Sequence, residues 1–143
     1  MFKKFKKQIN NEKGLTLIEL LAVIVILAIV AAIAVPAIGN VINNSRDKAI
    51  LAEASNILAG AKIAQVDNKC TTIADGSATC NKAELTNYVE GIELGAGDGA
   101  EKAIDGAWTI TFAKLAEIKQ TKFNSTISSN VVTENDLNTL LGN

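Results

Sequence analysis

The sequence contains no histidine, which removes the commonest general base and a frequent metal ligand. It also has no glycine-rich phosphate loop, no Ser-His-Asp arrangement, no zinc-ligand spacing and no clustered pair of carboxylates. Its acidic residues are scattered and are interpreted as solvated surface, with Glu19 as the exception. We therefore expect a protein that is not an enzyme and that has neither a cofactor nor a bound metal.

Cysteine is almost as scarce, because the chain has only Cys70 and Cys80. Their C-x9-C spacing is not that of a usual metal site, but it allows the two thiols to close a loop. Outside the cytoplasm such a disulfide forms and persists. Two free buried thiols are the alternative.

The charge is distributed unevenly. Residues 1–14 carry five lysines and one glutamate, a net charge of +4, whereas the whole chain carries -1, which leaves -5 for the remainder. The basic lead-in is interpreted as a targeting segment that faces the cytoplasm. The acidic remainder argues against nucleic-acid binding, which depends on clustered Lys and Arg, so we expect any such binding to be incidental.

An apolar run from Leu15 to Ile38 holds one charge, Glu19, and the only proline of the chain, Pro36. As a helix rising about 1.5 Å per residue it would be roughly 36 Å long, which is enough to cross a bilayer. A charge at the centre of a membrane helix costs roughly 2.5–3.5 kcal/mol, and less near an end. A carboxylate in such a helix therefore indicates a function.

Two simpler interpretations explain less of this stretch. A secretory signal could be cleaved at Ala32-Ile33-Ala34, but its apolar core would be shorter, about 7–15 residues, and would not begin with a carboxylate. A plain single-pass anchor fits the length and the preceding lysines. It gives no role to Gly14 or Glu19.

The stretch Gly14-Leu15-Thr16-Leu17-Ile18-Glu19, with lysines before it and an uninterrupted apolar run after it, resembles the class III signal of type IV pilins and pseudopilins. The resemblance covers roughly residues 6–64. It implies that a membrane peptidase cleaves between Gly14 and Leu15 and that the new N-terminus, Leu15, is methylated. Pro36 falls where many pilins also have a proline. Leu15 departs from the phenylalanine that is commonest at this position, which tolerates other hydrophobic residues.

The resemblance makes Glu19 the fifth residue of the mature chain, where its carboxylate can pair with the Leu15 α-amine. Two charges in an apolar environment are much less costly together than alone. The pair can close within one helix, because positions i and i+4 share a face, or between neighbouring copies. The family's filament implies the second arrangement, in which Glu19 sets the register of stacked helices. An intramolecular or helix-dipole role is the alternative.

A helix break, either a kink or a locally unwound turn, is predicted at Pro36 and Gly39, because proline removes a backbone hydrogen bond and glycine lowers helix propensity. Residues 39–69 keep a helical period and predict an amphipathic continuation that ends near residues 66–69. Its apolar stripe is predicted to comprise Ile42, Ile50, Ala54, Ile57, Leu58, Ala61 and Ala64. Its polar side is predicted to comprise mainly Asn44, Arg46, Asp47, Lys48, Glu53 and Lys62.

The segment between the cysteines has Asp75-Gly76 at its middle, which predicts a turn in a disulfide-closed loop or small hairpin. Asn81, with Glu84 three residues later, forms a capping-box pattern. It predicts a short helix that reaches about residue 89 and is stopped by Gly91.

Residues 95–99 are glycine-rich and are expected to form a flexible loop. Asp98, Glu101 and Asp105 lie around it, and a resemblance to the major pseudopilins of type II secretion would let them bind calcium. Because no EF-hand spacing is present, a solvated acidic loop without metal is the favoured interpretation.

Residues 107–113 alternate apolar and polar positions, which predicts a strand whose Trp108, Ile110 and Phe112 cover the striped half of the helix. A second strand is predicted over residues 116–123 and a weaker one near Ile127 or Val131. Residues 136–141 are predicted to form a last short helix.

The predicted fold class is α+β, a long N-terminal helix packed on a small antiparallel sheet. The predicted parts are a cleaved leader (residues 1–14), a transmembrane or filament-core helix (15–38), its amphipathic continuation (39–69) and a small head with the disulfide loop (70–143).

The resemblance implies a structural pilin subunit of an extracellular type IV pilus-like filament, with adhesion and motility as associated activities. The implied partners are copies of the chain, prepilin peptidase, and the pilus assembly platform with its ATPase machinery. The implied location is the cytoplasmic membrane, as a single-pass precursor, and then the cell surface. The alternatives are a pseudopilin or minor pilin of a type II secretion or DNA-uptake apparatus, and a membrane-anchored adhesion module that does not polymerise.

Overall fold

The computed structural model describes the backbone of residues 2–142 and the side chains of residues 16–142. The chain divides into two compact units, Met1–Val41 and Ile42–Asn143. Helix α1 (Phe2–Val66) forms the described part of the first unit and begins the second. Its end at Val66 agrees with the end predicted from the amphipathic period.

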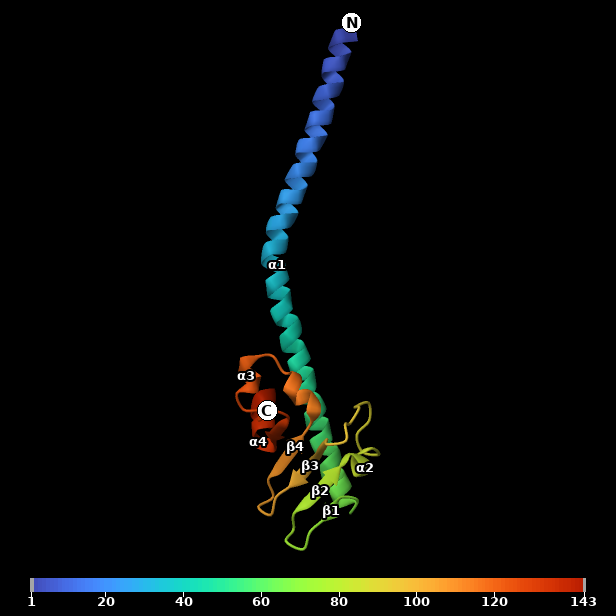
Figure 1. Cartoon of the computed structure of the whole chain (residues 1–143), viewed down its shortest axis with the longest axis vertical. Helices are drawn as coiled ribbons and strands as arrows, with labels where there is room; N and C mark the ends of the chain where they lie inside the picture. The colour runs from blue at the N-terminus through green and yellow to red at the C-terminus, as the bar shows by residue number, and fades with distance from the viewer. Residues whose placement is uncertain (1, 143) are drawn as a thin grey trace. The chain divides into compact units, whose positions relative to one another are not determined.

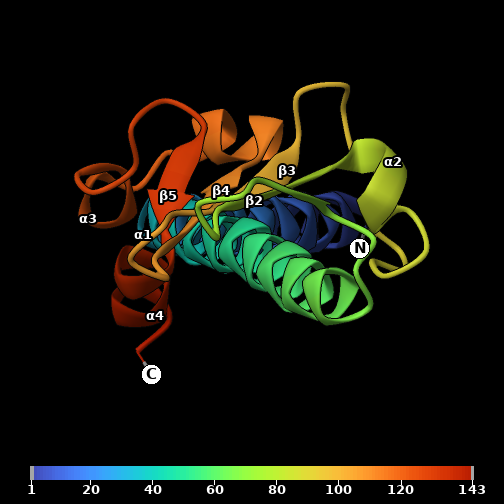
Figure 2. The ribbon, with the colours of Figure 1, turned by 90° about the horizontal axis from the view of Figure 1, so that it is seen from below.

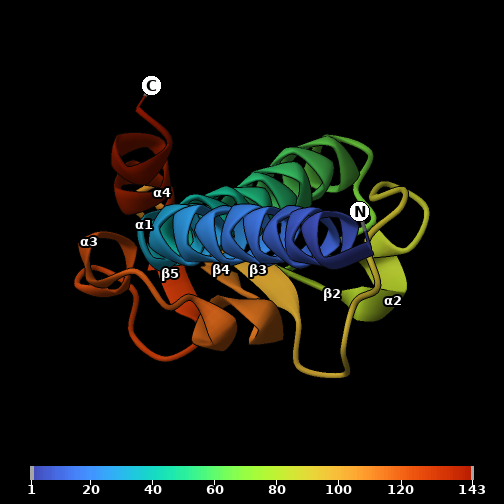
Figure 3. The ribbon, with the colours of Figure 1, turned by 90° about the horizontal axis from the view of Figure 1, so that it is seen from above.

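The second unit has two layers, a sheet and the part of α1 that lies along one face of that sheet (Figure 1). The same arrangement is seen along the helix from below in Figure 2 and from above in Figure 3. The five strands pair antiparallel in chain order. The elements after α1 are β1 (Thr71–Thr72), β2 (Ala78–Asn81), α2 (Lys82–Leu85), β3 (Gly99–Lys102), β4 (Trp108–Thr111), the 3-10 helix η1 (Ala113–Glu117), α3 (Thr121–Asn124), β5 (Val131–Thr133) and α4 (Glu134–Leu141). The predicted α+β architecture is confirmed.

Alternating residues of β4 produce the core, because successive side chains of a strand point to opposite faces. Trp108 and Ile110 are buried, as is Phe112 directly after the strand, whereas Thr109 and Thr111 are half-buried. The buried stripe of α1 comprises Ile50, Leu51, Ala54, Ile57, Leu58, Ala61 and Ala64. The prediction that Trp108, Ile110 and Phe112 face the core is therefore confirmed. Ile42 was predicted to join this stripe, but it is 60% exposed.

The strand predicted over residues 116–123 is wrong. This segment holds the end of η1 and most of α3, separated by residues 118–120, of which Ile118 and Gln120 have extended backbone. Alanine, leucine, lysine and glutamate dominate residues 113–117, and these are strong helix formers. The strand that pairs with β4 in the middle of the sheet is instead β3. Its sequence, Gly-Ala-Glu-Lys, lacks the β-branched residues that are typical of a strand. The weaker strand predicted near Val131 and the last helix, ended by Gly142 at φ +80°, are both present.

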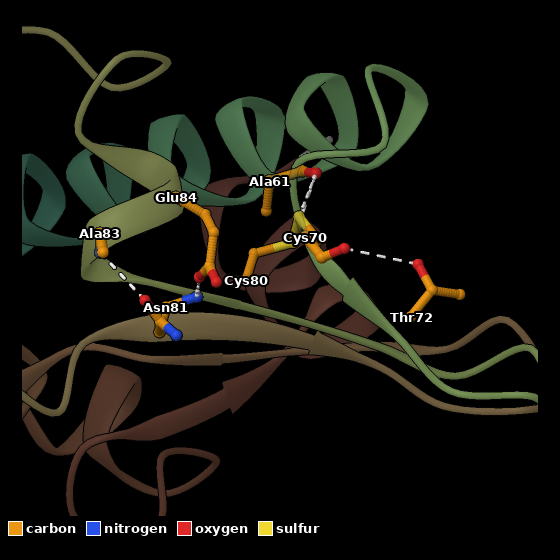
Figure 4. The surroundings of a disulfide bond; sticks show 7 residues. All are labelled: Ala61, Cys70, Thr72, Cys80, Asn81, Ala83 and Glu84. Atoms are coloured by element: carbon orange, nitrogen blue, oxygen red, sulfur yellow. Dashed lines mark hydrogen bonds between the residues drawn. A yellow bond between two sulfur atoms is a disulfide. The ribbon is translucent and has the colours of Figure 1, made fainter.

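Cys70 and Cys80 form a disulfide that closes the β1–β2 hairpin, as predicted. The bond is buried beneath α1, where both sulfurs lie within 3.8 Å of the Ala61 carbonyl oxygen (Figure 4). These are contacts rather than hydrogen bonds, because a disulfide has no S–H group. The disulfide therefore links the start of the hairpin to its end and packs both against the last turns of α1.

The capping box predicted after the hairpin is present (Figure 4). The Asn81 side chain accepts the Ala83 N–H at 3.0 Å, and the Glu84 carboxylate accepts the Asn81 N–H at 2.6 Å. The helix ends at Leu85, four residues earlier than predicted, and the chain continues through turns to Gly91 at φ +75°.

The Asp67 side chain, just after α1, contacts the segment that follows α2 by accepting the Tyr88 hydroxyl at 2.9 Å. This hydrogen bond and the negative charge of Asp67 raise the pKa of Tyr88, because they stabilise the protonated phenol. A raised pKa means that the contact contributes stability below the ordinary tyrosine pKa of about 10 and loses it as the pH rises through the folded value.

The alkaline titration of the chain tests this contact, since Tyr88 is its only tyrosine. We expect the phenolate absorbance of the folded protein to develop above the ordinary value of about 10, and Asp67→Ala to lower the midpoint toward it. Glu101→Gln, an exposed acid on β3, serves as the control and should leave the midpoint unchanged. Identical midpoints for wild type and Asp67→Ala would contradict the contact.

Two carboxylates that were interpreted as surface groups are buried. Asp47 is 1% exposed, and its oxygens accept the Gln120 N–H at 2.8 Å and the Lys119 N–H at 3.3 Å. Asp98 is 4% exposed and accepts the Gly95 N–H at 2.7 Å and the Ala113 N–H at 2.8 Å. The two side chains thus hold the backbone at both ends of the segment that contains η1. The predictions that Asp47 lies on the polar side of the helix and that Asp98 lies in a solvated loop are therefore wrong.

Candidate functional site: the apolar helix

The first unit exposes apolar side chains around the whole circumference of α1. Between Leu17 and Ile38 every large hydrophobic residue is about half exposed or more, from 49% at Val25 to 71% at Ile33. The most apolar stretch of the helix has a mean hydropathy of 3.1, and none of it is buried inside the protein. Among the described residues this is the one helix long and apolar enough to cross a membrane.

Such a surface is not the face of a soluble core helix. A helix packed on a globular core has one apolar stripe, whereas one that is apolar all round is surrounded by lipid or by other helices. Residues 42–66 of the same helix show the contrast, because their buried positions recur at three- and four-residue steps. The apolar half of α1 therefore needs partners that the rest of the described chain does not provide.

Glu19 is exposed in the first turns of this apolar surface. Among residues 16–142 no ion pair involves its carboxylate, since the salt bridges of the described chain all join the later part of α1 to the head. Leu15 lies one helical turn earlier, at position i-4, on the same helical face. The geometry thus supplies a carboxylate that forms no ion pair with the described residues, in an apolar stretch where an unpaired charge is costly.

The processing residues Gly14 and Leu15 have helical backbone, but the Leu15 side chain lies outside the described set. Cleavage between them, methylation of Leu15 and the pairing of its amine with Glu19 stay predictions.

Helix α1 continues without interruption through Pro36 and Gly39. The structure thus has no unwound turn at these positions, and a kink at Pro36 stays a prediction. No side chain lies within 4 Å of the position that a Cβ at Gly39 would occupy, so close packing in this chain does not explain the glycine.

The acidic loop offers no alternative site. The two Asp98 oxygens accept backbone N–H groups, and the Asp105 carboxylate accepts the Ala107 N–H at 3.0 Å. Within the described residues no group of three or more His, Cys, Asp or Glu side chains could hold a metal ion. The calcium site considered for this loop therefore has no clustered ligands here.

Residues 9–35 match the family model of the prokaryotic N-terminal methylation motif. The matched range includes Gly14, Leu15 and Glu19 and ends just before Pro36. Comparisons with curated proteins and with solved structures gave no match. The match thus identifies the signal at the start of the apolar helix and leaves the head to be interpreted from its own structure.

Proposed function

We propose that this chain, which carries the class III signal of type IV pilins and pseudopilins and is a pilin-like protein, is a structural subunit of an extracellular helical filament. In this proposal the precursor is anchored in the cytoplasmic membrane by residues 15–38 and is cleaved between Gly14 and Leu15 by prepilin peptidase. An assembly platform and its ATPase then move the mature chain from the membrane into the filament, with methylated Leu15 at its start.

The observation that carries this proposal is the all-round exposure of the apolar half of α1 behind a methylation motif. An anchor needs lipid around it and nothing more. A helix that also carries Glu19, and whose motif belongs to subunits that leave the membrane, needs a second apolar environment, and copies of the same helix provide it.

The driving forces in that exchange differ from those in water. Lipid tails are as apolar as the helix, so association depends on dispersion contacts and on polar pairs rather than on the hydrophobic effect. A Glu19 carboxylate paired with the Leu15 amine of a neighbouring copy would select one axial register, the best-attested use of a buried polar group. Because such a contact joins two different surfaces, it extends into an open helical polymer.

The N-terminus of the mature chain tests the processing step. We expect mass spectrometry of the purified protein to show a chain that begins at Leu15 and carries one methyl group on its α-amine. Loss of the peptidase should leave the intact precursor, with Met1 or its processed form at the start. A mature chain that begins after Ala34 would instead identify a secretory signal and contradict the proposal.

A further inference from the structure

Two turns at one end of the sheet share one conformation. Residues 73–77 connect β1 to β2, and residues 103–107 connect β3 to β4. In both, a glycine N–H donates to the carbonyl three residues earlier at 3.0 Å. In both, an aspartate Oδ1 accepts the N–H two residues later, at 2.9 Å in the first turn and 3.0 Å in the second. The glycines have φ values of +92° and +91°, which glycine adopts without strain.

The two turns lie side by side, because β2 and β3 are paired and Ala78 is opposite Lys102 at the ends that lead into them. Figure 1 shows both turns at the same end of the head. Each exposes an isoleucine, 56% at Ile73 and 70% at Ile104, at positions where polar residues would satisfy the turn equally well. We call the surface formed by Ile73, Asp75, Ile104 and Asp105 the acidic tip.

A surface of opposite charge lies at the other end of the head, near the start of the second unit. Lys48, Lys119 and Lys122 are exposed there, and none of them takes part in an ion pair among the residues that the structure describes. We call these three lysines the basic collar. The Asp47 carboxylate accepts the backbone N–H groups of Lys119 and Gln120. These hydrogen bonds hold the segment with Lys119 and Lys122 beside the part of α1 that carries Lys48.

Within the described residues no carboxylate pairs with the collar lysines, although the Lys122 Nζ lies over the Phe123 ring, 4.5 Å from its centroid. Asp47 is buried and engaged by those N–H groups, and Glu117 forms its own salt bridge with Arg46 at 2.8 Å. Lysine stems can also cover apolar surface while their ammonium groups remain free to pair.

From this complementarity we propose that the acidic tip of one copy docks on the basic collar of the next copy along the filament. The inference rests on the proposed function, which supplies the copies. The carboxylates Asp75 and Asp105 pair with the collar ammonium groups, and Ile73 and Ile104 pack on the lysine stems. Tip and collar are different surfaces at opposite ends of the head, so the contact does not close into a dimer and can repeat without limit.

Zero-length cross-linking of sheared filaments tests the contact directly. Filaments grown from a mixture of isotope-labelled and unlabelled chains are treated with a carbodiimide, which joins carboxylates to amines in contact, and the peptides are mapped. We expect links from Asp75 or Asp105 to Lys119, Lys122 or Lys48 that combine labelled and unlabelled peptides. Glu90, an equally exposed acid elsewhere on the head, should give no link to the collar.

A charge exchange provides a second test. Lys119→Glu with Lys122→Glu should make filaments come apart at clearly lower salt, because exposed pairs are screened within about 8 Å at physiological ionic strength. Adding Ala74→Lys and Asp75→Asn, which keeps a turn acceptor, should restore much of the resistance. Glu90→Lys is the control and should behave as wild type. Emission from the single, buried Trp108 reports whether each variant is folded.

If wild-type filaments form but give no links between tip and collar, the inference is wrong and the proposed function remains intact. The same holds if the charge exchange does not restore the salt resistance of the collar variant. Collar variants that lose only their attachment to anionic lipid vesicles would overturn it too, since they would assign the collar to a membrane surface. If the processed wild-type chain forms no filaments at all, the proposed function fails and the inference falls with it.

Discussion

Replacing Glu19 by alanine is expected to leave the chain in the membrane and to remove filaments from the cell surface. The apolar side chains on either side of Glu19 are untouched, and loss of one charge makes insertion easier. In the filament, however, the change would leave the Leu15 amine of a neighbouring copy without its partner. Removing one member of a buried ion pair costs roughly 3–5 kcal/mol, which corresponds to more than about a hundredfold in the association constant of each contact.

The comparison needs three variants beside the wild type, and two measurements. Membrane fractions measure insertion and N-terminal processing, and sheared surface fibres measure assembly. Glu90→Ala, which removes an exposed acid of the head, should behave as wild type in both measurements. Glu19→Gln, which keeps the shape and one acceptor oxygen, should assemble less than wild type but more than Glu19→Ala. Normal fibres from Glu19→Ala would show that the pair is dispensable and that Glu19 acts within its own helix.

The second large effect is expected at Asp47. Truncation to alanine removes the acceptor for the Lys119 and Gln120 N–H groups and leaves a cavity at the end of the core stripe of α1. Hydrogen bonds to a charged group contribute about 1.5–3 kcal/mol each, so we expect a loss of roughly 3 kcal/mol in the free energy of unfolding. The segment after η1 would lose its attachment to α1.

Urea unfolding of the full chain in detergent micelles, followed by Trp108 fluorescence, measures this loss. Asp47→Asn should cost less, about 1 kcal/mol, because one amide oxygen can still accept both N–H groups without the charge. Glu90→Ala, on the exposed surface, should stay within about 0.5 kcal/mol of wild type. If Asp47→Ala and Glu90→Ala unfold at the same urea concentration, the buried carboxylate does not hold the segment.

The sequence alone was sufficient to single out Glu19 but not Asp47. Glu19 stands out because every neighbour is apolar, so one carboxylate is visible without a structure. Asp47 does not, because a charged residue between Arg46 and Lys48 has the ordinary composition of a solvated helix face. Its one signal is position, since it lies three and four residues before Ile50 and Leu51, on the stripe that is buried.

The head shows the same limit. The disulfide hairpin, the capping box and β4 follow local rules of turn residues, side-chain caps and alternation, and local rules were sufficient to predict them. Strand β3 is defined by its neighbours: it pairs with β2 and β4 on both sides, although its own residues favour no strand. Pairing between distant segments, like the reach of Asp98 to Ala113, is not encoded in the spacing of either segment.

Electron microscopy of fibres sheared from the cell surface, with their subunits identified by mass spectrometry, tests the central claim most directly. The account predicts fibres built from this chain, each copy beginning at Leu15, with the apolar helices packed together along the axis. Processed chain found only as single copies in the envelope, with no fibre that contains it, would contradict the claim that this helix exchanges lipid for copies of itself.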